Sequence, residues 1–267
     1  MNLPNLINKK NLTFRENLYN FFATITGLTI FNWEIIKQAF VPPFEIPEIK
    51  KHMNELGIKT FPIVSVTGFV IGLVIVMQSE PVFVRFGASD FLPGASALSI
   101  VRELAPVITA LIFAGRVSSG IGAELGSMRV TEQIDAMEVS AINPFKYLVV
   151  TRVIATTMIL PILTIYVIFI AIAGGYLALS LSQGMNFEYY KNAVVDSVKF
   201  GDLIPSISKT FVFGYIVGIV GCYKGYIADG GTEGVGKAST TAVVLASLII
   251  LLIDTVLVKI SLMIWPM

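Results

Sequence analysis

Five apolar stretches, each long enough to cross a membrane as a helix, constrain this sequence more than any other feature. They cover about residues 61–83, 94–114, 147–181, 203–222 and 238–264. A helix needs about 20 mainly apolar residues to cross a hydrocarbon core about 30 Å thick, so these runs predict five membrane spans. The mean hydropathy is +0.78 and only 14% of the residues are charged. We therefore expect an all-α integral membrane protein.

The first sixty residues differ from the rest and predict a separate N-terminal segment, followed by a five-span domain over residues 61–267. Residues 18–40 alternate apolar and polar positions ahead of Pro42, a pattern typical of a helix lying in the membrane interface. An ordinary soluble amphipathic helix is the alternative. Arg15, Glu16 and Lys37 interrupt the region, so we expect no removable signal peptide.

The distribution of basic residues between the flanks and loops predicts the orientation. Thirteen fall on the side that holds the N-terminal flank, the stretch between spans two and three, and the last loop: Lys9, Lys10, Arg15, Lys37, Lys50, Lys51, Lys59, Arg116, Arg129, Lys146, Arg152, Lys224 and Lys237. The other side has only Arg85, Lys191 and Lys199. Because positive charge stays in the cytoplasm, we expect a cytoplasmic N-terminus and, with five spans, a C-terminus outside.

Residues 114–144 form a polar stretch between the second and third spans. Glycines at 120, 122 and 126 suit a sharp exit of the chain from the bilayer. Residues 130–141 have helical apolar periodicity with acidic residues on the other faces, Thr131 as a candidate N-cap, and Asn143-Pro144 as a stop. We predict a short cytoplasmic helix that transmits movement from a partner. A helix that only rests on the lipid headgroups is the alternative.

Seven charged residues fall within the predicted spans, and four of them lie at least six residues from either end, namely Arg102, Glu103, Lys209 and Asp254. Counted along the helices, all four lie in the outer half of the bilayer, where they could meet. An unpaired charge at a helix centre costs about 2.5–3.5 kcal/mol, so we predict a Lys209–Asp254 ion pair with Glu103 beside it. The residues leave open whether this pair is structural or takes part in transport.

The sequence gives only weak signals for nucleotide-binding, metal-binding or catalytic motifs. Residues 231–238, GTEGVGKA, approach a phosphate-binding loop, but Ala238 replaces the Ser or Thr that holds magnesium. His52 is the single histidine, expected far from any partner, and Cys222 is the single cysteine. We therefore expect no metal site, no bound cofactor and no catalytic residue in this chain. The net charge of +1 does not indicate a nucleic-acid partner.

Three neighbouring blocks carry a family resemblance: RELAPVITALIFAGR at 102–116, ELGSMRVTEQIDAM at 124–137 and NPFKYLVVTRVIA at 143–155. They resemble MlaE/YrbE-like permeases, the membrane subunits of MCE-type phospholipid ABC transporters. The resemblance implies a homodimer of five-span subunits in the bacterial inner membrane, each preceded by an interfacial elbow helix. It also implies a cytoplasmic ATPase that binds ATP and magnesium, and periplasmic MCE-domain subunits. Together these would move phospholipid between inner and outer membranes.

The resemblance also implies roles for individual residues. A coupling helix at about 127–142 would dock on the ATPase through Glu124, Arg129, Thr131, Glu132, Gln133, Asp135, Met137 and Glu138. Arg102, Glu103, Lys209 and Asp254 would form the intramembrane polar cluster. A lipid pocket near the outer face would be lined by Ile75, Val82, Phe83, Phe86 and Leu104. Ala105 departs from the glycine that the family often has in its RELGP segment.

Two other classes of function remain open from the residues alone. An ion-gradient-driven secondary transporter or channel would use Glu103, Lys209 and Asp254 as a relay, and would transport without a partner. A structural assembly subunit would bind no lipid.

Overall fold

The N-terminal part of the protein forms a single long helix. The computed structural model describes residues 4–42 and 44–264, with side chains from Phe22 onward, and it divides into the units Met1–Phe44 and Glu45–Met267. In the first unit α1 (Pro4–Ala39) begins well before residue 18, where the sequence pattern placed its start. Phe22 and Trp33 are exposed on it. The predictions that rest on the side chains of Lys9, Lys10 and Arg15 lie outside the described residues.

The second unit contains five helical stretches that are long and apolar enough to cross a membrane. The first is α2 (Ile46–Arg85). The second runs through η1 (Ser89–Phe91), α3 (Leu92–Ser99), η2 (Ile100–Leu104), α4 (Ala105–Phe113), η3 (Ala114–Ser118) and α5 (Ser119–Val130). The third joins η4 (Phe145–Val150) to α7 (Thr151–Gln183), and the others are α9 (Phe200–Tyr226) and α10 (Gly231–Ile264). No strand occurs in residues 4–42 or 44–264, in agreement with the predicted helical membrane protein.

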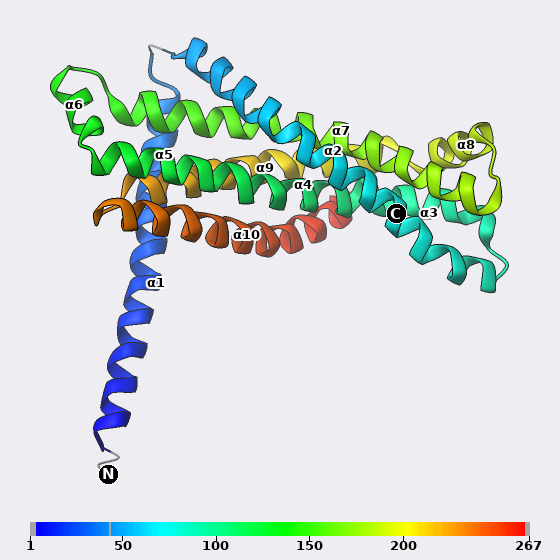
Figure 1. The fold of residues 1–267 in the computed structure, drawn as a ribbon, viewed down its shortest axis with the longest axis horizontal. Coiled ribbons are helices and arrows are strands. Elements are labelled where there is room, and N and C mark those ends of the chain that lie inside the picture. Colours follow the sequence, from blue (N-terminus) through cyan, green and yellow to red (C-terminus); the bar gives the residue numbers. More distant parts are fainter. Residues whose placement is uncertain (1–3, 43, 265–267) are drawn as a thin grey trace. The chain divides into compact units, whose positions relative to one another are not determined.

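Short helices mark the two ends of this bundle. In Figure 1, α6 (Gln133–Val139) lies at one end, while α3 and α8 (Phe187–Ser197) lie at the other. The Asn186 side chain caps α8 by accepting a hydrogen bond from the Glu188 N–H at 2.9 Å. Residues near either end of the bundle are therefore candidates for a function.

The first span is longer than the sequence pattern suggested. The apolar run predicts a start at about residue 61, but α2 starts at Ile46 and Pro62 lies in its interior. Pro47 occupies the first turn instead, where a missing N–H costs little. Gly57 and Thr60 are buried, so the segment before residue 61 is a helix with one packed face.

The second span does not leave the bilayer at its glycines, and the prediction of a sharp exit at 120, 122 and 126 is wrong. The helix continues to Val130. Gly122 and Gly126 let α5 approach α10 and the loop before it, because a Cβ at these positions would lie 3.4 Å from Ala238 O and 3.2 Å from Ala228 Cβ. Close packing rather than flexibility explains these two glycines.

Small residues bring the helices together. α2 packs along α7, where a Cβ on Gly72 would overlap the Ala171 carbonyl group and one on Gly174 would overlap Phe69 O. On α9, a Cβ on Gly214 would lie 2.5 Å from Thr156 O of α7, and one on Gly225 would lie 2.7 Å from Leu125 Cβ of α5. The glycine face of α9 therefore contacts two different helices.

The last connection is short. The apolar runs end at about residue 222 and begin again at about residue 238, but α9 continues to Tyr226 and α10 begins at Gly231. Residues 231–238 are therefore helical from their first residue, and they do not form the loop of a phosphate-binding motif.

Candidate functional site

Lys209 lies at the centre of an intramembrane charge cluster. Its Nζ lies 2.8 Å from Glu103 Oε2 and 3.0 Å from Asp254 Oδ1, so it joins α9 to η2 and to α10. The Lys209 side chain is 7% exposed, Asp254 is 16% exposed and Glu103 is 44% exposed. The structure thus brings together the three residues that the depth argument grouped.

Arg102 turns away from this cluster and pairs with a residue that the sequence reasoning missed. Its Nη2 lies 2.6 Å from Asp202 Oδ1, and its Nε donates to the same oxygen at 2.8 Å. Asp202 also accepts a hydrogen bond from the Lys199 backbone N–H at 2.9 Å, which caps the start of α9. An acidic residue three positions after a helix start is the signal that could have identified Asp202.

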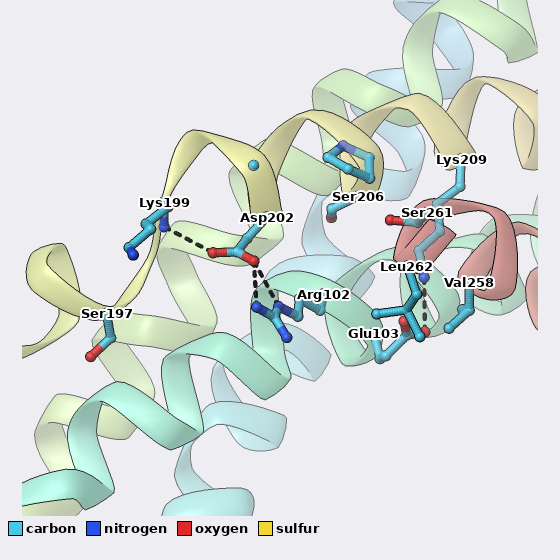
Figure 2. Close-up of a pocket in the computed structure, with 12 residues that line it drawn as sticks. Arg102, Glu103, Ser197, Lys199, Asp202, Ser206, Lys209, Val258, Ser261 and Leu262 are labelled. Atoms are coloured by element: carbon cyan, nitrogen blue, oxygen red, sulfur yellow. Dashed lines mark hydrogen bonds and ion pairs between the residues drawn. The ribbon is translucent and has the colours of Figure 1, made fainter. Parts of the chain in front are cut away.

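These two ion pairs border a polar cavity of about 380 Å³. Figure 2 shows the first turns of α9 on one side of it, η2 below, and the last turns of α10 on the other side. Ser206, a further residue not predicted, is buried there and donates to Val101 O at 2.6 Å. The complete lining of this polar cavity is Arg102, Glu103, Ser197, Lys199, Gly201, Asp202, Pro205, Ser206, Lys209, Val258, Ser261 and Leu262.

The five residues suggested for lipid contact differ in their burial. Ile75 and Phe83 pack against the buried cluster that α2 forms with α3, α7 and α8. Val82 is 53% exposed and Phe86 is 78% exposed. Leu104 is half-buried on η2, one residue after Glu103. Their contact with lipid stays a prediction.

The short helix between spans two and three is present but smaller than expected. It is α6, and Thr131 is not its N-cap, because the Thr131 hydroxyl donates back to Ser127 O at 2.8 Å and ends α5. Glu132 precedes α6 with a left-handed φ of 59°. The helix stops at Val139, before Asn143-Pro144, and Asn143 instead accepts from the Lys146 N–H at the start of the third span.

Some side chains around α6 hold it against α5, and others are exposed. Ile134 is fully buried and Arg129 pairs with Asp135, so these residues hold α6 against α5. Exposed positions on the same stretch are Thr131, Glu132, Gln133 and Glu138, with Met137 half-buried. Glu124 lies on α5 and pairs with Arg152 of α7 at 2.7 Å.

His52 has charged neighbours, contrary to the expectation that it lies far from any partner. It lines a second cavity together with Glu124 and Arg152. The cause of the wrong prediction is the length of α2, whose helical extension brings His52 alongside the second and third spans.

The sequence matches the family described as Permease MlaE over residues 49–260, which is most of the chain. The chain belongs to the MlaE permease family. A probable ABC transporter permease protein of Rickettsia typhi is 36% identical over 252 residues, covering 94% of this chain and 95% of the relative. The MlaE permease protein of the intermembrane phospholipid transport system of Haemophilus influenzae is 34% identical over 222 residues, covering 80% and 85%.

A more similar but shorter match is a probable ABC transporter permease protein of Synechocystis. It is 41% identical over 200 residues, or 75% of this chain and 76% of that protein. Like these relatives, this MlaE-family chain is an ABC transporter permease and a multi-pass membrane protein. The matched region contains α6 and all of the residues that line the polar cavity except Ser261 and Leu262.

Proposed function

We propose that this chain is the permease subunit through which an ABC transporter moves phospholipid-like lipids between the inner and outer membranes. A separate cytoplasmic ATPase would supply the energy, and α6 would be its docking helix. The observation that carries the proposal is the position of α6, between two spans of an MlaE-family permease and with acidic residues exposed. The name of the Haemophilus relative, a phospholipid transport permease, supports the substrate class.

The attachment of α6 suits the transmission of movement. Only Thr131 and Glu132 separate it from α5, and Ile134 and Asp135 tie it to that helix. A push on α6 would therefore reach spans two and three without being absorbed by a long loop. In the proposed orientation α6 lies in the cytoplasm, where an acidic surface is repelled by anionic lipid and remains available to a protein partner.

The polar cavity at the other end of the second unit is the proposed place for the lipid headgroup. Lys199 and Arg102 supply positive charge to its lining, and Glu103 and Lys209 also line it. A second copy of the chain would complete an apolar cavity with Val82, Phe86 and Leu104, and periplasmic MCE-domain subunits would receive the lipid. The Lys209 cluster would hold three helices in register beside this cavity.

The docking role of α6 is tested by co-purifying the chain with its ATPase and measuring lipid-stimulated ATP hydrolysis in nanodiscs. The double variant Glu132→Lys and Glu138→Lys reverses two exposed charges and leaves the Arg129–Asp135 pair intact. We expect ATPase capture and turnover to fall at least about tenfold, as for the loss of complementary charges at an interface. The control is Glu188→Lys, an exposed acidic residue at the opposite end of the bundle. Turnover equal to that of the control would reject the docking role.

The Lys209 cluster favours one second candidate, an ion-driven transporter. Two carboxylates share one ammonium group at the wall of a cavity, an arrangement that suits an ion relay. This candidate predicts that the chain alone transports substrate in liposomes when an ion gradient is imposed. The ABC permease predicts transport only with the ATPase and ATP.

A further inference from the structure

A second cavity lies among three helices and takes no part in the function proposed above. It has a volume of about 180 Å³ and is bordered by the N-terminal third of α2, by η3 and α5, and by the first turn of α7. We call it the basic pocket, and its lining includes His52, Lys59, Arg116, Gly120, Glu124 and Arg152. Arg152 is the second residue of α7, and Glu124 is six residues before the end of α5.

The charges of the basic pocket do not cancel. Glu124 and Arg152 neutralise each other at 2.7 Å, and Arg152 also donates to Leu148 O at 2.8 Å. Arg116 donates to the Thr60 hydroxyl at 2.8 Å, which leaves its positive charge uncompensated. Lys59 forms no ion pair with the described side chains, and Glu55 is the one further carboxylate in the lining. The pocket therefore carries an excess of one positive charge.

One wall of the basic pocket has no side chain. A Cβ at Gly120 would meet nothing within 4 Å, so this helical glycine borders open space rather than a packed neighbour. The other glycines of the same helix, Gly122 and Gly126, contact α10 and the loop before it. A packing role explains those two and does not explain Gly120.

The size and charge of the basic pocket indicate the size and charge of its ligand. A volume of about 180 Å³ is below that of pockets for drug-sized molecules, about 300–1,000 Å³, and suits a compact group. The net positive charge disfavours a cation. A guanidinium group with an ammonium group beside it is the usual protein partner of phosphate oxygens.

The position of the basic pocket along the span, near the headgroup region, also fits a phosphate group. Lys59 lies at the start of the apolar part of α2, two residues before Phe61, so the pocket lies where a span meets the headgroup region. Basic pockets between membrane helices on the cytoplasmic side bind anionic lipid headgroups. Long basic side chains reach that level with their stems in apolar surroundings.

We propose that the basic pocket binds a phosphate group through Arg116 and Lys59, with Gly120 providing the space. The same chemistry is offered by a lipid headgroup and by soluble phosphate. The proposal concerns binding by this chain alone and does not rest on the proposed transport cycle. It adds a second ligand site, at the α6 end of the permease.

The test uses the full chain in detergent and two probes. In the first arm, native mass spectrometry measures binding of dioleoylphosphatidylglycerol, with dioleoylglycerol as the phosphate-free lipid. In the second arm, inorganic phosphate is titrated and the unfolding temperature is followed. The variants are Gly120→Leu, which fills the pocket, and Arg116→Gln. The matched control is Gly115→Leu, because a Cβ at Gly115 also meets nothing within 4 Å but lies outside the pocket lining.

A lipid ligand predicts that phosphatidylglycerol binds about tenfold more weakly to both pocket variants than to the control, the loss expected for one charged contact. Dioleoylglycerol would bind all chains alike. If the ligand is soluble phosphate, only the phosphate titration distinguishes the pocket variants from the control. Inorganic phosphate then raises the unfolding temperature of the wild type and the control but of neither pocket variant. Equal behaviour of Gly120→Leu and Gly115→Leu in both arms overturns the proposal, whatever the result of the ATPase experiment.

Discussion

The ammonium group of Lys209 lies 3.0 Å from the carboxylate of Asp254, and this contact joins α9 to α10 within the apolar part of both helices. Because Lys209 also binds Glu103, one buried lysine connects three segments that are distant in the sequence. Removing one partner of such a group is costly, since the charge that remains has lost both water and its counter-ion.

Lys209→Met is therefore expected to lower the free energy of unfolding by about 3 kcal/mol, because it leaves the largely covered Asp254 carboxylate unpaired. Equilibrium unfolding in mixed detergent micelles measures the change. The exposed Lys259, on α10 with Asp254, provides the control, and Lys259→Met is expected to change stability by less than about 0.5 kcal/mol. Adding Asp254→Leu and Glu103→Gln to Lys209→Met should recover most of the loss, and a failure to recover would contradict the charge-based explanation.

Gly72→Ala is expected to destabilise the protein by about 2–3 kcal/mol, because the new Cβ would overlap the Ala171 backbone and push α2 away from α7. Gly236→Ala is the matched control. Gly236 lies within α10, where a Cβ meets open space, so alanine should stabilise by about 0.5–1 kcal/mol through its higher helix propensity. Thermal unfolding of both variants in detergent gives the comparison, and shifts of the same sign would argue against helix contact as the cause.

Ala141→Gly is expected to stabilise the connection after α6 by about 0.5–1 kcal/mol. Ala141 has a left-handed φ of 60°, which costs a residue with a Cβ about 1–2 kcal/mol, and glycine avoids this cost at some loss of unfolded-chain entropy. The measurement is the unfolding temperature, with hydrogen exchange at α6 as a local readout. Ser140→Gly, at a neighbouring position with φ of −82°, should destabilise or have no effect.

The burial of Tyr190 predicts that the free energy of unfolding falls at alkaline pH. Burial raises the pKa of Tyr190 from 10 to about 12, and its hydroxyl donates to Ile172 O at 2.9 Å. The fold therefore favours the protonated phenol. This contribution is fully present below pH 10 and is lost as the pH rises towards 12, by up to roughly 3 kcal/mol.

Tyr190→Phe tests that expectation. The variant should be about 1 kcal/mol less stable at neutral pH, because the Ile172 carbonyl loses its donor, and its stability should fall less steeply between pH 10 and 12. Unfolding by denaturant at several pH values separates the two effects. Parallel curves for the wild type and the variant would show that Tyr190 does not control the alkaline loss.

Hydropathy and residue position along the spans were enough to predict the five spanning helices, the short helix after the second span, and the meeting of Lys209 with Asp254. These features depend on local properties. An apolar run of sufficient length forms a helix in lipid whatever surrounds it, and the depth of a charge follows from counting residues along that helix.

The tertiary structure alone decided the rest. The packing of Gly122 against α10 depends on which helix faces are brought into contact. The same is true of the pairing of Arg102 with Asp202 rather than Lys209, and of the charged neighbours of His52. A sequence read one helix at a time contains no information on those contacts. They follow from the simultaneous packing of several helices, in which a small residue on one permits the close approach of another.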